Sequence, residues 1–436
     1  MLTRRRFITG SIVCLTGGLL AACSGSSQEG GTTVEPVGAT QVPTTDGTPS
    51  MTPQSSSEGS SGGREPIRVG LVVQKTGVFA IIGQYIEEGL RLFLDSVNNH
   101  VSGREIELVV ADEGEEAEQG LNAIRQVVER SRVHILAGIV KSNVAYGMRD
   151  YVHSHEIPTL IANAGAHGLT LDPARRSPFI YRTSFANGQM EYPLGPYAVN
   201  VLGYERVLVL ASDYSAGYEH AEGFKKGFGK NGGIVVDEIY PPLNTNDYGP
   251  YLKRVNDIVS GGGVDAVWAF FAGADAVRFV TQYADFGLKD KVPLIGTGWL
   301  TSENYLQQLG DSAEGIVTSL HYAVRHGSNE NREFVDSYVA KYNHLPSQDS
   351  YHGYVTGRVI YEALEAIEGA VEEKDRFLEA LRAVNFIGPT GAVRFHPETQ
   401  NVIVNCFILQ AVPSNGEYIN QILDYIPDVP DTVLVE

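Results

Sequence analysis

The sequence is poor in cysteine, with only three among 436 residues. Three cysteines cannot build the disulfide framework on which small secreted domains depend. Cys14 and Cys23 lie in the first 23 residues, and Cys406 lies in the apolar run 402–409. A buried cysteine in such a run behaves as a small hydrophobic side chain. We therefore expect no cysteine chemistry in the folded part.

Basic residues are also scarce: 33 Lys and Arg stand against 52 Asp and Glu, a formal net charge of −19. So acidic a surface repels phosphate backbones, and we expect no nucleic-acid partner. The only long apolar run lies at the N-terminus, which excludes a protein with several membrane spans. The sequence also lacks the patterns of metalloproteases, serine hydrolases, dithiol enzymes and phosphate loops. We predict no enzyme, no cofactor and no bound metal.

The N-terminus has the order of an export signal. Arginines 4–6 precede an uncharged apolar stretch at 7–22, and small residues lead up to Cys23. This order is typical of a secretory signal peptide over residues 1–22. The arginines resemble a twin-arginine signal, and residues 20–23 (LAAC) resemble a bacterial lipobox, which implies a lipid on Cys23. The general export route and a short anchoring helix are the alternatives.

The next segment, residues 23–65, is built mainly of Ser, Gly, Thr, Pro and Gln with scattered acidic residues. It has too little apolar surface to form a core, which predicts a disordered tether. With a lipid on Cys23, the tether would hold an exported domain in the periplasm or on the outer face of the cytoplasmic membrane.

From residue 66 the chain alternates short apolar strands with amphipathic helices. Strands that are apolar on both faces belong to parallel sheets covered by helices. The pattern restarts near residue 206, which predicts two doubly wound α/β lobes. The predicted strands cover residues 67–73, 106–111, 133–140, 158–162, 178–183, 206–210, 234–240, 265–271, 292–296 and 315–321. The predicted helices cover residues 83–101, 119–130, 143–155, 218–230, 248–259, 275–286, 331–343, 351–370 and 374–384.

The end of the chain predicts that each lobe is completed by a later segment. We expect an N-terminal lobe of residues 66–185 with 322–388, and a C-terminal lobe of residues 186–321 with 389–430. Residues 391–411 contain two apolar runs around a turn at 397–400, a hairpin pattern. Several crossings between lobes would form a hinge, with the ligand in the cleft between them.

Several stretches resemble one known family, in order along the chain. They are residues 70–83 (GLVVQKTGVFAIIG), 136–143 (LAGIVKSN), 158–170 (PTLIANAGAHGLT), 181–185 (YRTSF) and 294–299 (LIGTGW). Over about residues 66–412 the chain is similar to the branched-chain amino-acid-type (Leu/Ile/Val-binding-like) periplasmic binding proteins of ABC importers, and above all to the subgroup that binds aromatic and other organic acids. The resemblance implies a type I periplasmic-binding-protein fold with three hinge crossings and a membrane permease as partner. We expect a monomer.

One group of candidate ligand residues follows the strands of the first lobe. Ser142 sits at or near the N-cap of a predicted helix, where its hydroxyl and the free N–H groups of the first turn suit a carboxylate. Asn163, Ala164 and Gly165 follow the next strand, where small side chains let a ligand approach the backbone. In similar proteins the matching serine and loop hold the ligand carboxylate. An ordinary helix cap and a tight glycine loop are the alternatives.

A second group supplies apolar or aromatic walls, which suit an aromatic ligand. Its members are Phe79, Ile82, Tyr214, Phe271 and Trp299. Amino-acid binders of the family often have an aromatic residue at the place of Ile82, so this wall differs from theirs. Trp268 and Phe270 are expected to pack in the core.

The ligand class is predicted from a missing charge. Amino-acid binders of the family pair the ligand ammonium with carboxylates, because a desolvated cation must be paired. Those places fall at Gly298 and near Asn187, although Asp213 and Glu303 are close enough to substitute. We therefore predict an importer component that binds a small aromatic or apolar carboxylic acid. A branched-chain amino-acid binder and a sensory subunit of the same fold are the alternatives.

Overall fold

The computed structural model describes residues 64–435. The signal peptide predicted at 1–22, the lipid predicted on Cys23 and nearly all of the tether predicted at 23–65 lie outside these residues. Every helix within residues 64–435 is too short or too polar to cross a membrane.

The first sheet has the strand order β2-β3-β1-β4-β5-β6, and its strands are parallel except for the short β2. Its strands are β1 (Ile67–Val73), β2 (His100–Val101), β3 (Arg104–Asp112), β4 (Ile135–Gly138), β5 (Thr159–Ile161) and β6 (Ile180–Arg182). The helices between them are α1 (Ala80–Ser96), α2 (Ala117–Glu129), α3 (Ser142–Ser154) and α4 (Gly168–Leu171).

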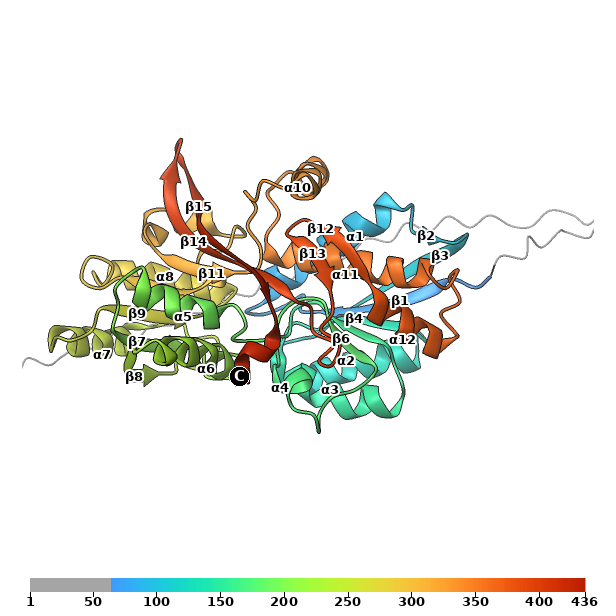
Figure 1. Ribbon diagram of the computed structural model, residues 1–436, viewed down its shortest axis with the longest axis horizontal. Helices are drawn as coiled ribbons and strands as arrows, with labels where there is room; N and C mark the ends of the chain where they lie inside the picture. Colours follow the sequence, from blue (N-terminus) through green and yellow to red (C-terminus); the bar gives the residue numbers. More distant parts are fainter. Residues whose placement is uncertain (1–63, 436) are drawn as a thin grey trace, which may run out of the picture. The chain divides into compact units, whose positions relative to one another are not determined.

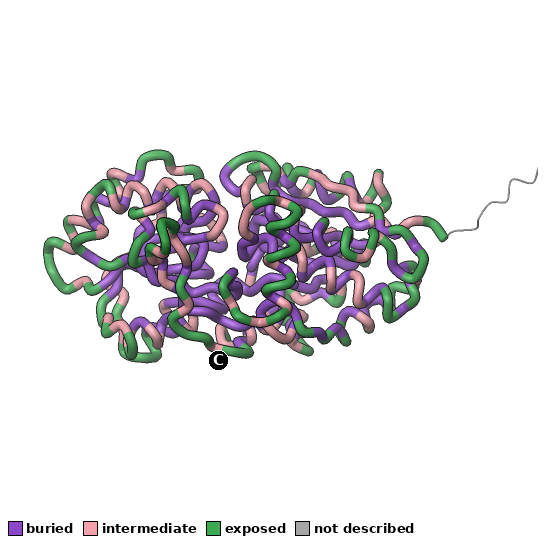
Figure 2. Tube along the Cα trace, turned by 90° about the horizontal axis from the view of Figure 1, so that it is seen from above, coloured by how far each residue is buried: buried purple, intermediate pink, exposed green. Residues whose placement is uncertain are grey.

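Successive residues of β1 face different layers of the core. Leu71 packs with residues of α1, whereas Val72 packs with residues of α2 and α3, so helices cover both faces of the sheet (Figure 1). This is why the strands of a parallel sheet are apolar at every position. Figure 2 shows the result: buried stretches run through the interior, and the exposed stretches form the outer turns and helix faces.

Three late helices return to the first sheet: α10 (Asn329–Tyr342), α11 (Gln348–Glu365) and α12 (Lys374–Ala383). Helix α11 lies against α1, and the two backbones approach at glycines. A Cβ at Gly89 would lie 1.9 Å from the carbonyl oxygen of Ser350, and a Cβ at Gly353 would lie 2.0 Å from that of Ile86. Only glycine fits at such contacts.

The second sheet has the order β15-β14-β11-β10-β9-β7-β8, parallel except where β14 and β15 join its edge. Its strands are β7 (Arg206–Ala211), β8 (Ile234–Ile239), β9 (Ala266–Phe270), β10 (Leu294–Thr297), β11 (Val317–Leu320), β14 (Val404–Ser414) and β15 (Glu417–Val429). Its helices are α5 (Glu191–Asn200), α6 (Ser215–Lys230), α7 (Gly249–Ser260), α8 (Ala274–Asp285) and the short α9 (Leu306–Leu309). The predicted α/β fold with two mostly parallel sheets is confirmed.

The predicted hairpin at 391–411 is confirmed only beside its turn, where Phe395 pairs antiparallel with Val402 and the Ile403 N–H donates to the Arg394 carbonyl at 3.0 Å. The longer pairings of its two strands differ from the prediction. Strand β13 (Gly391–Arg394) pairs with β12 (Asn385–Gly388), and β14 pairs with β15. Asn415 and Gly416 connect β14 to β15, and both have positive φ, 52° and 87°. Asn-Gly is the preferred sequence for such a two-residue turn, and it was the better hairpin signal.

Helix α5 is absent from the sequence prediction. It contains Pro193, Gly195 and Pro196, residues that usually end a helix. Pro193 is tolerated in the first turn, where its missing N–H has no intrahelical partner to lose. Gly195 is required by the neighbour, because a Cβ there would lie 2.2 Å from the backbone nitrogen of Phe228 on α6.

Candidate ligand-binding site

A small cavity lies where strand ends of both sheets face each other. Like small-molecule sites in other proteins, it is lined mainly by apolar and aromatic side chains with a few polar groups. The wall consists of Phe79, Ile82, Val140, Ser142, Asn163, Gly165, Phe185, Asn187, Tyr214, Ala216, His220, Phe270, Ala272 and Trp299. Seven of the residues predicted from the sequence are therefore brought together: Phe79, Ile82, Ser142, Asn163, Gly165, Tyr214 and Trp299.

Ser142 is the first residue of α3, directly after the turn that follows β4. The buried carboxylate of Glu113 fixes this turn, since it accepts hydrogen bonds from the backbone N–H groups of Val140 at 2.6 Å and Lys141 at 2.9 Å. Burial raises the pKa of Glu113 to about 7. The serine hydroxyl is thus held at the positive end of a helix dipole, a place that favours an anion.

Asn163 and Gly165 come from the loop after β5. The Asn163 amide donates to the carbonyl oxygen of Val140 at 3.0 Å, and its own oxygen has no partner among the described residues. A Cβ at Gly165 would lie 2.0 Å from the side-chain oxygen of Asn187 and 2.7 Å from the Phe185 ring. Glycine is therefore needed here for close packing of side chains, and it does not have a positive φ.

Ala164 is a correction to the sequence prediction. Its side chain packs in the core cluster beneath α2 and α3 and does not line the cavity. Its backbone N–H donates to the carbonyl oxygen of Ile139 at 2.9 Å, so it is not available to a ligand.

The aromatic wall also differs from the prediction, by one residue. Phe270 lines the cavity, whereas Phe271 packs on the other side of the sheet against Phe279 at 4.3 Å and Tyr248 at 5.3 Å between ring centroids. Side chains alternate between the two faces of a strand, so an error of one position exchanges cavity for core. The prediction that Phe271 is a cleft residue is therefore wrong, whereas Phe270 belongs to the core cluster as predicted and also lines the cavity.

The other predicted aromatics form a connected wall. The ring of Tyr214 lies 6.2 Å from the rings of both Phe79 and Phe270. Trp299, in the short 3₁₀ helix Gly298–Thr301, lies 4.9 Å from Phe185. Such tilted and offset pairs favour an aromatic guest, which can add one more ring to the set.

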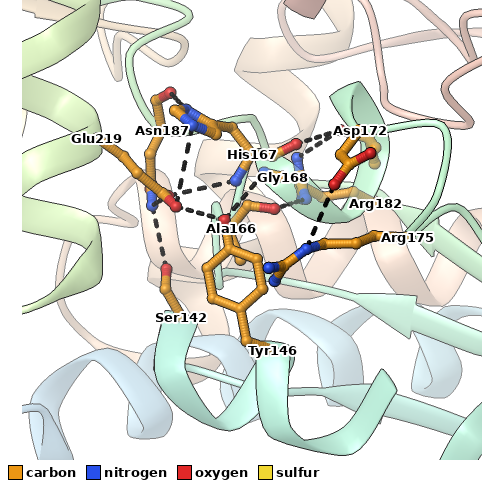
Figure 3. Close-up of polar contacts among 11 residues, drawn as sticks. Ser142, Tyr146, Ala166, His167, Gly168, Asp172, Arg175, Arg182, Asn187 and Glu219 are labelled. Carbon is orange, nitrogen blue, oxygen red and sulfur yellow. Dashed lines mark hydrogen bonds and ion pairs between the residues drawn. The ribbon is translucent and has the colours of Figure 1, made fainter. Parts of the chain in front are cut away.

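A polar network beside the cavity joins the two halves of the fold (Figure 3). Glu219 on α6 accepts hydrogen bonds from the Asn187 amide at 2.7 Å, the backbone N–H of His167 at 3.2 Å and the hydroxyl of Tyr146 on α3. The Asn187 amide also donates to the Ser142 hydroxyl at 3.1 Å. Burial and the nearby carboxylate raise the pKa of Tyr146, which keeps it a donor. Glu219 is thus fully engaged with protein donors.

The carboxylates considered for pairing an ammonium lie elsewhere. Asp213 is exposed and accepts from the Tyr218 hydroxyl. Glu303 is beside Asn420 in a separate small pocket, where burial raises its pKa to about 7. A Cβ at Gly298 would lie 2.6 Å from Leu320, so no acidic side chain fits there. Among residues 64–435, no carboxylate lines the cavity.

Several lining residues were not predicted as site residues: Val140, Phe185, Asn187, Ala216, His220, Phe270 and Ala272. Phe185 stands in the stretch 181–185 that carried the family resemblance, so that stretch could have given it. His220 has no sequence signal of its own. Its Nδ1 lies 3.0 Å from a carboxylate oxygen of Glu191, a buried residue at the start of α5, the helix that the sequence did not predict.

Comparisons with known proteins agree with this architecture. Residues 66–417 match the family model described as periplasmic binding protein. A Leu/Ile/Val-binding protein homolog 6 from Brucella melitensis is 30% identical over 364 residues, which cover 81% of this chain and 90% of that protein.

Two solved structures are similar throughout the folded part. An ABC transporter substrate-binding protein from Sphaerobacter thermophilus is 42% identical, with a TM-score of 0.79 over 84% of this chain and 99% of that one. A solute-binding protein of an ABC transporter from Rhodopseudomonas palustris, in complex with benzoate, is 30% identical, with a TM-score of 0.77 over 84% of this chain and 98% of that one.

Proposed function

Because the chain belongs to the periplasmic binding protein family and is the solute-binding protein of an ABC transporter, we propose that it captures an aromatic or other apolar carboxylic acid between its two sheets. One observation carries the proposal: the cavity combines an aromatic wall with the Ser142 hydroxyl and has no carboxylate among residues 64–435. An ammonium would be desolvated there without a counter-charge. The benzoate bound by a 30% identical relative supports the same class.

The two halves of the cavity have different roles in this proposal. Ser142 and the backbone at Gly165 hold the carboxylate, since they offer hydroxyl and N–H donors beside a helix N-terminus, and Asn163 lines the same part of the cavity. Tyr214, Phe270 and Trp299 close over the body of the ligand. Closure is favoured because the ligand contacts both halves only in the closed state, which gives it a higher affinity for that state.

The lipid anchor, the tether and the lobe boundaries are proposals from the sequence. We propose a signal peptide at 1–22, a lipid on Cys23, a tether to residue 65, an N-terminal lobe of 66–185 with 322–388 and a C-terminal lobe of 186–321 with 389–430. Replacing Cys23 with Ala tests the anchor: the exported protein should move from the membrane fraction to the soluble fraction. A variant that stays on the membrane refutes the lipid.

A branched-chain amino-acid binder is the second candidate, favoured by the Leu/Ile/Val-binding relative. A thermal-shift panel separates the two, using full-length protein refolded once to remove any carried ligand. Benzoates, phenylpropanoid acids, short aliphatic acids, leucine and valine form the panel. A ligand at a thousandfold excess over its dissociation constant adds about 4 kcal/mol of stability. We expect shifts with aromatic acids and none with leucine or valine, and the reverse pattern refutes the proposal.

A sensory subunit of the same fold would bind the same ligands, so a binding assay cannot separate it from an importer component. Uptake of radiolabelled acid by cells with and without the protein separates them. Loss of uptake without the protein is expected, and unchanged uptake refutes the transport role.

A further inference from the structure

A buried acid–imidazole pair stands behind the cavity wall. Glu191 has no exposed surface, and its two carboxylate oxygens form no hydrogen bond among the described residues. The His220 Nδ1 lies 3.0 Å from that carboxylate. Nδ1 likewise forms no hydrogen bond among the described residues, and it is the ring nitrogen next to this carboxylate. Because an ionised carboxylate only accepts hydrogen bonds, the contact favours the tautomer with its hydrogen on Nδ1.

Glycine packing between α5 and α6 brings the two groups together. A Cβ at Gly227 would lie 2.0 Å from the carbonyl oxygen of Tyr192, and a Cβ at Gly223 would lie 2.3 Å from the Cα of Gly188, just before α5. The helices therefore pack backbone to backbone. Glu191, at the N-terminus of α5, then reaches His220 on α6, and the helix dipole favours its negative charge.

The orientation of the imidazole is fixed on both sides. Its ring is stacked on Phe270 at 4.2 Å between centroids, and Trp299 lies edge-on at 5.7 Å. The ring lines the cavity while Nδ1 is turned to Glu191 and has no accessible surface. Nε2 is therefore the nitrogen presented to a ligand. With the hydrogen on Nδ1, Nε2 has a lone pair and accepts.

We propose that His220, positioned by Glu191, recognises a hydroxyl group on the ligand, so that the preferred ligand is a hydroxylated aromatic acid. The inference rests on the proposed function, because it assumes that an aromatic acid occupies this cavity. The ligand hydroxyl donates its hydrogen to Nε2, and Glu191 accepts from Nδ1. An unhydroxylated ring would leave Nε2 without a partner in a desolvated site, which is costly.

The same geometry disfavours the other possible guests. A second ligand carboxylate has no hydrogen to donate to Nε2. An ammonium has three N–H donors and a full charge, and one neutral nitrogen cannot pair it. A phenolic hydroxyl has one hydrogen and a flat apolar ring, which match the single acceptor and the aromatic wall.

The test compares dissociation constants for full-length protein with benzoate, the three monohydroxybenzoates and the fluorobenzoates of matched position. At least one hydroxybenzoate should bind tenfold or more tightly than both benzoate and its fluoro analogue. If benzoate binds measurably and the ratio of the benzoate to the hydroxybenzoate dissociation constant is near one, this inference is overturned and the proposed function stands. No binding by any benzoate overturns the proposed function itself.

Two variants assign the preference to the pair. In His220→Phe, the ratio of the benzoate to the hydroxybenzoate dissociation constant should fall below three, and Glu191→Gln should lower it as well. A ratio retained in folded His220→Phe overturns the role of the imidazole.

Imidazole ¹⁵N spectra of the unaltered protein give a readout that does not depend on variant folding. We expect the Nδ1–H form for His220, with an Nε2 resonance that moves when the hydroxybenzoate is added. The Nε2–H form in the free protein, or an unmoved Nε2 resonance, overturns the proposal. In Glu191→Gln the population of the Nδ1–H form should fall, an effect that loss of packing alone would not produce.

Discussion

Replacing Glu219 with Gln should weaken ligand binding, although Glu219 does not line the cavity. Its carboxylate on α6 accepts from Asn187, His167 and Tyr146, groups that belong to or adjoin the first sheet. The bonds from Tyr146 and His167 cross between the two proposed lobes and form only when the lobes are together, so they stabilise the state that encloses the ligand. Gln keeps the shape of the side chain, removes the charge and turns an amide group toward one of the donors.

The magnitude follows from the bonds that are lost or weakened. A hydrogen bond to a charged group contributes about 1.5–3 kcal/mol, and bonds that share one acceptor are not additive. We therefore take the value of a single bond as the expected loss. At about 1.4 kcal/mol for each factor of ten, affinity should fall by about 10- to 150-fold. The loss should appear as faster dissociation, because bonds inside the closed state do not form until after encounter.

Isothermal titration with benzoate measures the affinity, and stopped-flow fluorescence of the cavity tryptophan, Trp299, measures dissociation. Glu222→Gln is the matched control, since it removes the same charge from the same helix at an exposed position. Glu222→Gln should bind within threefold of the unaltered protein. Glu219→Gln binding within threefold as well would refute the view that this network holds the closed state.

Changes at Ser142, at Phe270 and Phe271, and at Glu303 give three further predictions. Ser142→Ala should weaken carboxylate binding by about 1–3 kcal/mol in titration calorimetry, through the lost hydrogen bond to a charged group, and an unchanged dissociation constant would remove this serine from the site. Phe270→Ala should lower ligand affinity more than Phe271→Ala does. Phe271→Ala should instead lower the unfolding free energy by about 3–5 kcal/mol in denaturant titration. The opposite order of ligand affinities would mean that the cavity wall is assigned to the wrong residue. Burial raises the pKa of Glu303 and of Asp349 to about 7, so the folded protein holds protons that the unfolded chain has released. The two carboxyl groups stabilise the folded state fully below their unfolded-state pKa, and this stabilisation is lost as pH rises toward 7. The difference in unfolding free energy between the unaltered protein and Glu303→Gln should therefore fall over pH 4.5–7 by at most about 1.4 kcal/mol per pH unit, and a difference that is flat or rises would contradict the burial argument.

Local pattern predicted the elements of the fold because each follows from nearby residues. Strand β1 was predicted with the bounds observed, Ile67–Val73, and α12 to within one residue at its end. The failures have local causes as well. Pro193 and Pro196 concealed α5, and the Asn415-Gly416 turn was not used, so β15, the long partner of β14, was missed. The short β12, which pairs with β13, was missed as well.

The candidate site shows more clearly what the local sequence could predict and what it could not. Ser142, Asn163 and Gly165 were predicted to come together because they follow adjacent parallel strands, and carboxyl ends of such strands meet at one edge of a sheet. The choice between Phe270 and Phe271 could not be made in this way. Both residues are apolar, and the strand is buried on both faces, so no polar alternation marks which side faces the cavity.

The sequence by itself determined the α/β architecture, the family and the loops that carry the first half of the site, because helix and strand periods and strand-end loops are local properties of the chain. Only the tertiary structure decided which side chains meet across the cavity. Glu219 with Tyr146 and Glu191 with His220 are pairs from different helices. Their contact depends on how closely α6 packs against α5 and α3. Glycines set the distance between α5 and α6, and their neighbours are known only once the chain is folded.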